Sequence, residues 1–431
     1  MKKLISFLLL LSFSAVSFAQ SMPKDADPAI WAKAVKIHKR AIVIDGHNDI
    51  TSPMVDEDLD LATNTVGKYH ADGDPFHTDL GRFKASGISG EFFSIYVSGA
   101  MLKTGGAMRR AMDLIDATYR EAEKHPQALT MCTTAAEIRR AKKAGKVCAL
   151  MGIEGGYAIE NSLYALRDFY RLGIRYMTLT HNVSHDWADA HRGEVKNNGL
   201  SDFGKEVVRE MNRLGMFIDI SHVSVKVMDD VLDISTAPII ASHSNARSVN
   251  DHTRNVPDEV LKRVAKNGGV IMLNFYPSFL DARTNKEEND RAAKLRPQID
   301  ALREKYKDDT QAYNEAERKL LADNPIYVAS YTRIVDHIDH IKQVTGTVDN
   351  IGIGSDYDGV PFLPAGMNGM EDLVLVTYEM LKRGYSENDI KKVLGENMLR
   401  AMTQMEKVAG SKRISGDGSL KKLAPPKVGG N

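Results

Sequence analysis

Continuous apolar runs and amphipathic segments alternate along most of the chain. Eight apolar runs predict buried strands, at 41–45, 87–97, 146–155, 176–181, 216–222, 238–244, 269–276 and 350–359. Between them lie segments with helical spacing and helix-end signals, such as Thr134 with Glu137 as a capping box and Gly215 as a C-cap. Strands that are apolar on both faces and alternate with helices indicate a parallel sheet covered by helices on each side. Eight of them predict an α/β protein with a closed (β/α)8 TIM barrel. The alternative is an open doubly wound sheet, but no glycine-rich phosphate loop follows the first strand.

Two segments depart from this alternation. Residues 281–324 follow the seventh predicted strand and are nearly half charged, with both signs in similar numbers. They predict a solvated helical insertion on the side of the barrel where chemistry occurs, and it is either a lid or a surface excursion. Residues 409–431 are rich in Gly, Pro and Lys, which predicts an extended or disordered tail. The barrel domain is therefore expected to span 20–408.

The N-terminus has the pattern of an export signal. The stretch "MKKLISFLLLLSFSAVSFAQ" has two lysines, an apolar run and small residues near Ala19, which predicts a signal peptide over 1–19. The alternative is an N-terminal membrane anchor, although the run is short for one. No later run is long enough to cross a membrane. We therefore expect an exported protein, periplasmic or secreted, with no membrane span in the mature chain.

Charge and cysteine content narrow the picture further. The chain has 57 basic and 57 acidic residues, and a formal charge of zero argues against a nucleic-acid-binding protein. Cys132 and Cys148 are the two cysteines. Cys148 lies in the apolar run "VCALMGI", where a small thiol packs well, and this favours buried thiols over a disulfide. The composition leaves a homodimer open.

Side chains able to bind metals or transfer protons gather at the predicted strand ends. They are His47, Asp49, Glu154, His181, His222, His243 and Asp356. In a barrel the carboxyl ends of the strands meet at one rim, so these residues are expected to face one site. Imidazoles and carboxylates are suitable ligands for zinc.

More than four candidate ligands imply more than one metal ion. Glu154 in "GIEGG" is the natural bridging carboxylate between two ions, because it ends a strand and is flanked by glycines. His47 and Asp49 would complete the first ion, and His222 and His243 the second. Water between the two ions would be acidified into a nucleophile.

Other histidines have other predicted roles or none. On its own, any one of the histidines at the strand ends would be read as structural. His337 and His340 lie three residues apart on an amphipathic segment and are expected to pack or cap. No role is assigned to a remaining group, namely His70, His77, His185, His191 and His252.

These motifs resemble the renal-type membrane dipeptidases, a family of zinc peptidases with an amidohydrolase-like barrel. The resemblance runs from about residue 40 to 405. It rests on "IDGHND", "HTDLGRFKASGISGEFFSIY", "GIEGG", "LTH", "WAD", "DISH", "SHSNARSVNDHTRNVPD", "GSDYDGVP" and "GENMLR".

The resemblance implies the same two ligand sets and adds three roles. It implies that His181 contacts the scissile carbonyl oxygen, that Arg254 binds the carboxylate of a dipeptide, and that Asp356 transfers a proton to the leaving amine. It also implies that a D-residue is accepted at the C-terminal position. The sequence departs from the family in lacking the Asn expected three residues after His181, and in having a longer charged insertion.

The sequence therefore predicts an exported dinuclear zinc dipeptidase. Two alternatives stay open. One is another amide hydrolase on the same barrel, such as an N-acyl-amino-acid deacylase, since Arg254 suits both. The other is a zinc-binding or scavenging protein that has lost turnover, against which the presence of Asp356 and His181 argues.

Overall fold

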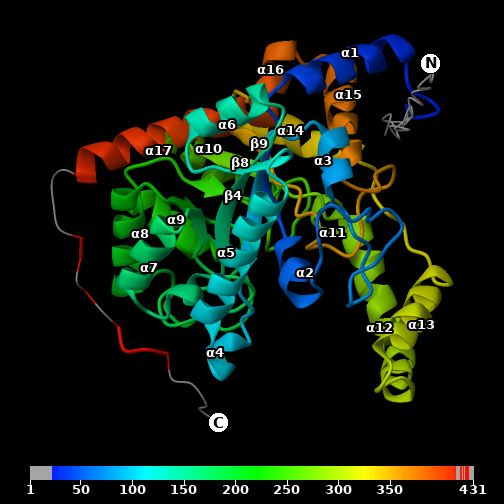
Figure 1. Cartoon of the computed structure of the whole chain (residues 1–431), viewed down its shortest axis with the longest axis horizontal. Helices are drawn as coiled ribbons and strands as arrows, with labels where there is room; N and C mark the ends of the chain where they lie inside the picture. The colour runs from blue at the N-terminus through cyan, green and yellow to red at the C-terminus, as the bar shows by residue number, and fades with distance from the viewer. Residues whose placement is uncertain (1–21, 414–417, 420, 422, 427–431) are drawn as a thin grey trace, which may run out of the picture.

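The computed structural model describes residues 22–413, 418–419, 421 and 423–426. All nine of its strands pair in parallel, and eight of them close into a barrel with helices on the outside (Figure 1). Their order around the barrel is β1, β2, β4, β5, β6, β7, β8 and β9, and the pairing of β2 with β4 closes the ring. The predicted TIM barrel is confirmed, and the open sheet is excluded.

All the predicted strands are present, although their ends differ from the apolar runs. The strands are β1 (Ile44–Asn48), β2 (Gly90–Tyr96), β3 (Leu129–Met131), β4 (Val147–Glu154), β5 (Ile174–Thr178), β6 (Phe217–Asp219), β7 (Ile240–Ala241), β8 (Val270–Leu273) and β9 (Ile351–Ile353). The strand missed from the sequence is β3, which pairs with the first half of β4 outside the ring. Three residues are too few to show an alternating pattern.

The helices surround the ring. They are α1 (Pro28–Arg40), α2 (Thr51–Asp56), α3 (Leu80–Ser86), α4 (Met101–Thr104), α5 (Ala107–Lys124), α6 (Ala135–Lys143), α7 (Leu163–Arg171), α8 (Asp202–Leu214), α9 (Val225–Ile234), α10 (Asp258–Asn267), α11 (Pro277–Leu280), α12 (Ala282–Lys305), α13 (Thr310–Ala322), α14 (Thr332–Thr345), α15 (Val374–Lys382), α16 (Glu387–Lys391) and α17 (Asn397–Arg413). Short helical turns are η1 (Gly156–Ile159), η2 (Met370–Leu373) and η3 (Lys392–Glu396).

The predicted helix ends are confirmed. Thr134 and Glu137 form the capping box of α6, so each side chain accepts a hydrogen bond from the backbone of the other residue. Gly215 ends α8 with a φ of 88°, a left-handed conformation in which a Cβ is strained.

Two apolar cores stabilise the barrel. The inner core fills the ring with side chains such as Phe92, Leu150 and Phe217, and methionines of α17 belong to the same cluster. Arg400 on α17 donates to the carbonyls of Gly268 and Asp349, which lie just before β8 and β9, so α17 crosses the end where the strands begin. The outer core lies between strands and helices. Because one end is covered by α17, the opposite rim is left for a site.

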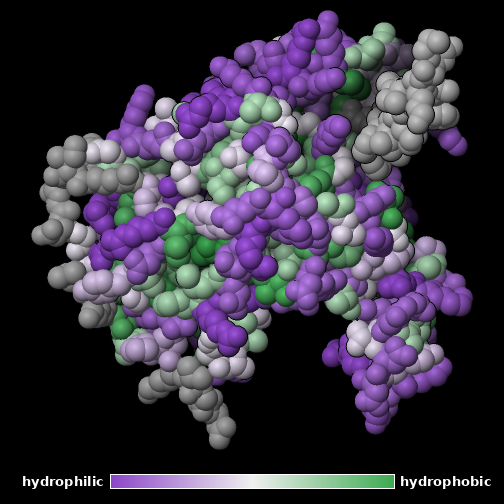
Figure 2. Space-filling model, in the orientation of Figure 1, coloured by the Kyte–Doolittle hydropathy of each residue, from purple (hydrophilic) through white to green (hydrophobic). Residues whose placement is uncertain are grey.

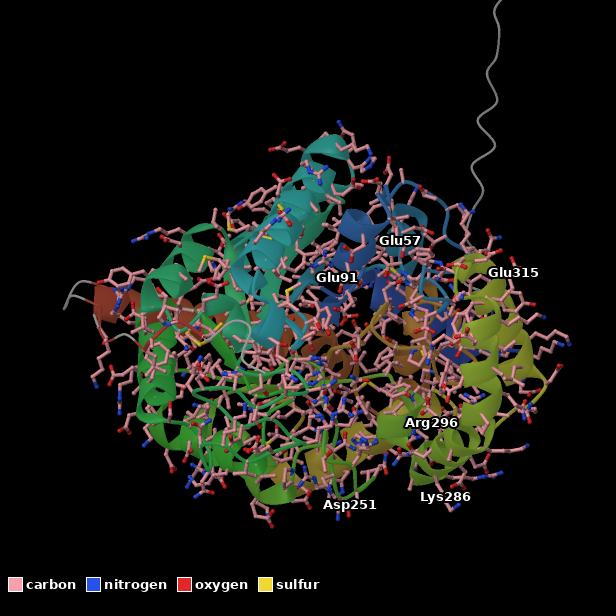
Figure 3. All side chains as sticks on the ribbon, turned by 90° about the horizontal axis from the view of Figure 1, so that it is seen from below. Glu57, Glu91, Asp251, Lys286, Arg296 and Glu315 are labelled. Atoms are coloured by element: carbon pink, nitrogen blue, oxygen red, sulfur yellow. A yellow bond between two sulfur atoms is a disulfide. The ribbon has the colours of Figure 1, made fainter. Side chains whose placement is uncertain are left out.

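The charged insertion is helical, as predicted. It forms the helices α12 and α13 after β8, the seventh strand of the ring, and they project from the body in Figure 1. Their outward surface is mostly hydrophilic in Figure 2. Figure 3 shows Lys286 and Glu315 at the outer edge of this pair, and the Lys286 side chain is 76% exposed.

The expectation of free buried thiols was wrong. Cys132 and Cys148 form a disulfide, with their Cα atoms 5.5 Å apart. Cys132 follows β3, and its backbone N–H donates to Ala149 of β4. The short strand β3, which the sequence did not reveal, therefore brings the two sulfurs together.

The two ends of the chain are only partly described. The predicted signal peptide, 1–19, lies outside the described residues. At the other end α17 continues to Arg413, five residues beyond the expected domain end at 408. The described tail residues are irregular, and Lys421 forms an ion pair with Glu206 on α8. No helix in the described part of the chain is long and apolar enough to cross a membrane.

Candidate metal centre

Glu154 is the centre of the site. It is the last residue of β4, and Gly155 follows with a φ of 105°, so the chain turns away directly after the carboxylate. Its two oxygens face different partners. Oε2 lies 3.5 Å from His47 Nε2, whereas Oε1 lies 3.0 Å from His222 Nε2 and 3.4 Å from His243 Nε2.

His47 lies where the pairing of β1 with β2 is irregular. The register of β1 against β2 shifts between Asp45 and Asn48, which is the effect of a β-bulge. A bulge re-aims the side chains on either side of it. His47 Nδ1 is hydrogen-bonded to the Tyr176 hydroxyl at 2.7 Å, which leaves Nε2 to face Asp49 Oδ2 at 3.2 Å and Glu154.

The Tyr176 ring fits inside the barrel because of a glycine. A Cβ on Gly152 of β4 would lie 2.0 Å from the tyrosine ring, so a larger residue there would displace the ring. The hydrogen bond from Tyr176 to His47 therefore depends on Gly152. The hydrogen bond was not predicted from the sequence, since Tyr176 of β5 and His47 of β1 belong to strands that are not neighbours and meet only across the closed ring.

His222 and His243 form the other half of the centre. Their Nε2 atoms lie 2.9 Å apart. Two imidazole lone pairs directed at one point repel each other unless a proton or a cation lies between them. His243 Nδ1 is hydrogen-bonded to Ser242 Oγ at 2.7 Å, and Ser242 Oγ donates to Asp219 Oδ2 at 2.6 Å. A histidine held in this way through its second nitrogen is typical of metal ligands.

Asn182 connects three imidazoles and was also missed. Its Oδ1 lies 3.0 Å from both His222 Nδ1 and His191 Nε2, and its Nδ2 lies 3.2 Å from His181 Nε2. The family departure noted after His181 places Ser184 at the third position, where its hydroxyl accepts from Ala190 N–H. The amide that contacts His222 belongs to the residue next to His181.

The electrostatics of the centre suit metal ligands. Burial, and then His47 and Arg254, lower the pKa of His243 to about 3, and burial lowers that of His222 well below its usual range. Burial acts against ionisation of Glu154, but His47 and His181 hold its pKa well below the usual range. Neutral His222 and His243 beside an ionised carboxylate are in the forms that bind a metal. His47 differs, because burial lowers its pKa but Tyr176, Asp49 and Glu154 raise it well above the usual range, and a bound cation would act in the opposite direction.

The five predicted ligands fit two adjoining metal sites. His47, Asp49 and Glu154 form one group of atoms within 4.8 Å of one another, and Glu154, His222 and His243 form another. His47 Nε2 is buried and has no hydrogen-bond partner in the described part of the chain, as expected of a nitrogen whose partner is a metal ion. A third group combines His47 and His243 with Asp356.

Asp356 lies at the rim of the same centre. It follows β9 with a φ of 66°, an uncommon conformation for a residue other than glycine. Its Oδ1 lies 4.0 Å from His47 Nε2, and its Oδ2 accepts a hydrogen bond from Asn274 Nδ2 at 2.7 Å. Burial, and also Asp49 and Glu154, raise its pKa to about 8. A bound cation would act in the opposite direction.

His181 and Arg254 border the cavity above the centre. His181 Nε2 lies 4.0 Å from Glu154 Oε1, and its side chain is 19% exposed. The Arg254 guanidinium is buried and donates to Ser244 Oγ and the His243 carbonyl, each at 3.1 Å. Its Nε has no partner among the described residues. The structure therefore brings all eight predicted site residues to one rim.

The remaining histidines are separate from the ligand sets. His337 is buried and contacts Ala246 N–H and the Leu280 carbonyl, so it packs as expected. His340 pairs with Asp258 in the first turn of α10. Of the unassigned histidines, His185 makes a structural contact through Nε2 with the Leu179 carbonyl at 2.8 Å, whereas His191 and His252 line the cavity above the centre.

The centre opens into a cavity of about 640 Å³. The insertion contributes to its wall, through Asn285, Glu288, Asn289 and Ala292 of α12.

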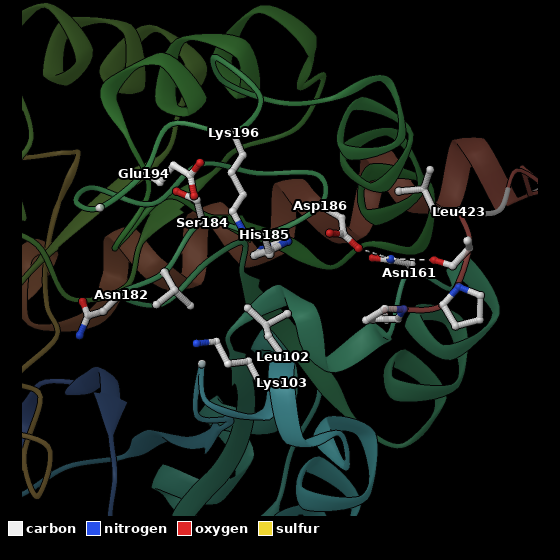
Figure 4. A pocket seen from close by; sticks show the side chains of 16 residues that line it. Leu102, Lys103, Asn161, Asn182, Ser184, His185, Asp186, Glu194, Lys196 and Leu423 are labelled. Atoms are coloured by element: carbon white, nitrogen blue, oxygen red, sulfur yellow. Dashed lines mark hydrogen bonds between the residues drawn. The ribbon is translucent and has the colours of Figure 1, made fainter. Parts of the chain in front are cut away.

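A second cavity of about 700 Å³ shares Asn182 with the first and is bordered by tail residues 423–426. There Asn161 Nδ2 donates to Asp186 Oδ2 and to the Ala424 carbonyl (Figure 4). None of the residues that line it belongs to the two ligand groups of the centre, so the candidate site is the first cavity.

Comparison with known proteins finds one family over nearly the whole chain. The model of the membrane dipeptidase family (peptidase family M19) matches residues 31–416. The structure is similar to that of the probable dipeptidase PvdM from Pseudomonas aeruginosa, with 25% identity, a TM-score of 0.72 and coverage of 88% of this chain and 99% of that one. A metallopeptidase from Rhodobacter sphaeroides, solved with a phosphinate mimic of the dipeptide L-Ala-D-Ala, shows 26% identity and a TM-score of 0.67 over 85% of this chain and 99% of that one. The dipeptidase AC, a metallopeptidase, shows 26% identity and a TM-score of 0.66 over 85% and 98%.

Proposed function

Because this chain belongs to the membrane dipeptidase family and is therefore a metallo-dipeptidase, we propose that it hydrolyses free dipeptides at a centre of two zinc ions. The ligands in this proposal are His47, Asp49, Glu154, His222 and His243. The observation that carries it is the position of Glu154, whose two oxygens face two different sets of ligand atoms. A carboxylate so placed suits the bridge of a two-metal hydrolase, whose ions lie about 3.5–4 Å apart.

Residues around the centre would bind the carbonyl oxygen and transfer the proton. Two zinc ions bound there would polarise the scissile carbonyl and lower the pKa of a water molecule between them. His181 is placed to donate a hydrogen bond to the carbonyl oxygen as negative charge develops on it. Asp356 would take a proton from the attacking water and deliver it to the departing nitrogen.

The cavity also supports the predicted binding of the dipeptide's carboxylate. Arg254 is buried at the wall, and its free Nε–H is a donor without a partner among the described residues. A guanidinium fork matches the two oxygens of a carboxylate. The Rhodobacter sphaeroides protein holds a mimic of L-Ala-D-Ala, which supports substrates whose C-terminal residue is a D-amino acid.

We also propose that the protein is exported to the periplasm or secreted. The disulfide between Cys132 and Cys148 supports this proposal, because disulfides persist in oxidising compartments. The predicted signal peptide is consistent with it. A homodimer stays a prediction that the arrangement of a single chain does not test.

A dipeptide panel tests the proposed function. We expect the purified protein to hydrolyse L,L and L,D dipeptides, to lose activity with a chelator, and to regain it when zinc is restored. N-acyl amino acids belong in the same panel. Turnover of N-acyl amino acids without turnover of dipeptides would instead assign the site to a deacylase.

Replacing Arg254 tests how the substrate is held. Arg254→Leu should raise KM for free dipeptides by about 30-fold or more, since removing one partner of a buried charge pair costs about 2–5 kcal/mol. C-terminally amidated dipeptides should already be poor substrates of the wild type and should lose little more. Arg254→Lys, which keeps the charge but not the forked donor geometry, should have a KM between those of the wild type and Arg254→Leu. An equal loss on free and amidated dipeptides would make Arg254 a structural residue.

A further inference from the structure

The cavity above the centre has charges of opposite sign on its two sides. Its basic side chains, Arg192 and Arg254, come from the loops that follow β5 and β7. Its acidic side chains outside the centre come from the loops and helix that follow β8, β9 and β1. They are Asp72, Asp74, Glu288 and Asp358. Because β8, β9 and β1 are neighbours in the ring, these four carboxylates share one arc of the rim, which we call the acidic arc.

Tyr276, which also lines the cavity, lies beside two members of the acidic arc, Asp74 and Glu288. Glu288 Oε1 accepts a hydrogen bond from the Tyr276 hydroxyl at 2.6 Å. Burial, and then Glu288, raise the pKa of that hydroxyl, and Asp74 raises it further. Burial, and then the adjacent Asp72, raise the pKa of Asp74 to about 6. Asp74 from the β1 loop and Glu288 from α12 therefore lie on the same part of the wall.

Two members of the acidic arc, Asp74 and Glu288, have no cationic partner. Both are partly buried, and neither they nor the exposed Asp72 form an ion pair with Lys or Arg among the described residues. Asp358 differs, because its buried side chain is paired with His70, whose Nε2 lies 3.1 Å from Oδ1. Although burial opposes both charges, this contact raises the pKa of His70 and lowers that of Asp358. Partly buried carboxylates without a counter-charge are costly unless a ligand supplies one.

A dipeptide with an uncharged amino-terminal side chain brings too little positive charge for this arc. Its carboxylate is matched by the basic side, and its single ammonium group can neutralise one carboxylate. We propose that the acidic arc binds a cationic side chain on the amino-terminal residue, so that dipeptides beginning with lysine, ornithine or arginine are preferred. The proposal rests on the proposed dipeptidase function and gives α12 of the insertion a role in substrate selection.

The test compares pairs of substrates that differ in one charge. We expect kcat/KM of the wild type for Lys-Ala to exceed that for norleucine-Ala, and that for Arg-Ala to exceed that for citrulline-Ala, each by about 10-fold to 100-fold. This is the range expected for a hydrogen bond to a charged group. Asp74→Asn and Glu288→Gln should each reduce these ratios several-fold, and the double variant should bring them close to one.

A matched variant and the substrate pairs separate the outcomes. Asp290→Asn removes a carboxylate of the same helix that pairs with Lys286 on the outside and does not line the cavity, so it should leave the ratios unchanged. Equal hydrolysis of charged and neutral dipeptides by the wild type would overturn the inference and leave the dipeptidase proposal intact. A preference that persists in the double variant would overturn it as well. Failure to hydrolyse any dipeptide in the presence of zinc would instead refute the proposed function.

Discussion

Asp356→Asn is expected to lower kcat for dipeptide hydrolysis by about 10²–10⁴, the usual contribution of a general acid–base group. The amide keeps the shape of the carboxylate and can still contact Asn274, but it cannot carry a proton between water and the leaving nitrogen. The five proposed ligands do not include Asp356, so the zinc content and KM should stay near their wild-type values. Elemental analysis and steady-state kinetics on the same preparations measure all three quantities.

A second aspartate provides the control for this variant. Asp349 lies before the other end of β9 and pairs with Lys392, far from the rim, so Asp349→Asn should keep full activity. The competing possibility is that Asp356 is itself a ligand, since it forms a group with His47 and His243. Loss of one zinc ion from Asp356→Asn would establish that role and would refute the proton transfer proposed here.

His243→Ala is expected to lose both metal and activity. The wild type should contain about two zinc ions per chain, and this variant should retain about one, because Glu154 and His222 alone are a poor site. Its kcat should fall at least as far as that of Asp356→Asn, since the water between the ions would no longer be activated. Ser242→Ala should have a smaller effect, about 10-fold to 100-fold in metal affinity, because Ser242 acts only by holding Nδ1 of His243.

A histidine outside the site is the matched control. His340 lies on α14 and pairs with Asp258, so His340→Ala should keep the full zinc content and activity. If carefully purified wild type holds a single ion and is fully active, the two-metal proposal is wrong. If His243→Ala keeps two ions, then His243 is not a ligand and its contact with Glu154 has another purpose.

The proposed ligands could be named from the sequence because each lies next to a strand that the sequence reveals. His47, Glu154, His222 and His243 end apolar runs long or regular enough to be recognised as strands. Parallel strands in a barrel all end at one rim, so a residue's place at a strand end is enough to group it with others hundreds of residues away. The same reasoning placed Asp356 after the last strand. The helical insertion was equally predictable, since its charge pattern leaves no apolar face for a strand.

Contacts that depend on side-chain direction across the ring were not predictable. The hydrogen bond of Tyr176 with His47 needs the close approach that Gly152 allows. Asn182 orients His222 from a loop whose path has no periodic signal. The disulfide was misjudged for a related reason, because Cys132 reaches Cys148 only through a three-residue strand, β3.

By itself, then, the sequence determined the barrel, the rim that carries the chemistry and the five candidate ligands. These follow from local patterns of apolar and polar residues and from the rule that parallel strands end together. Only the tertiary structure decided which oxygen of Glu154 faces which ligand set, because side chains from β1 and from the ends of β6 and β7 meet Glu154 of β4 only in the closed ring. It also decided that Asp74 and Glu288 share one wall of the cavity. They are more than two hundred residues apart, and only the adjacency of β1, β9 and β8 in the closed ring brings them together.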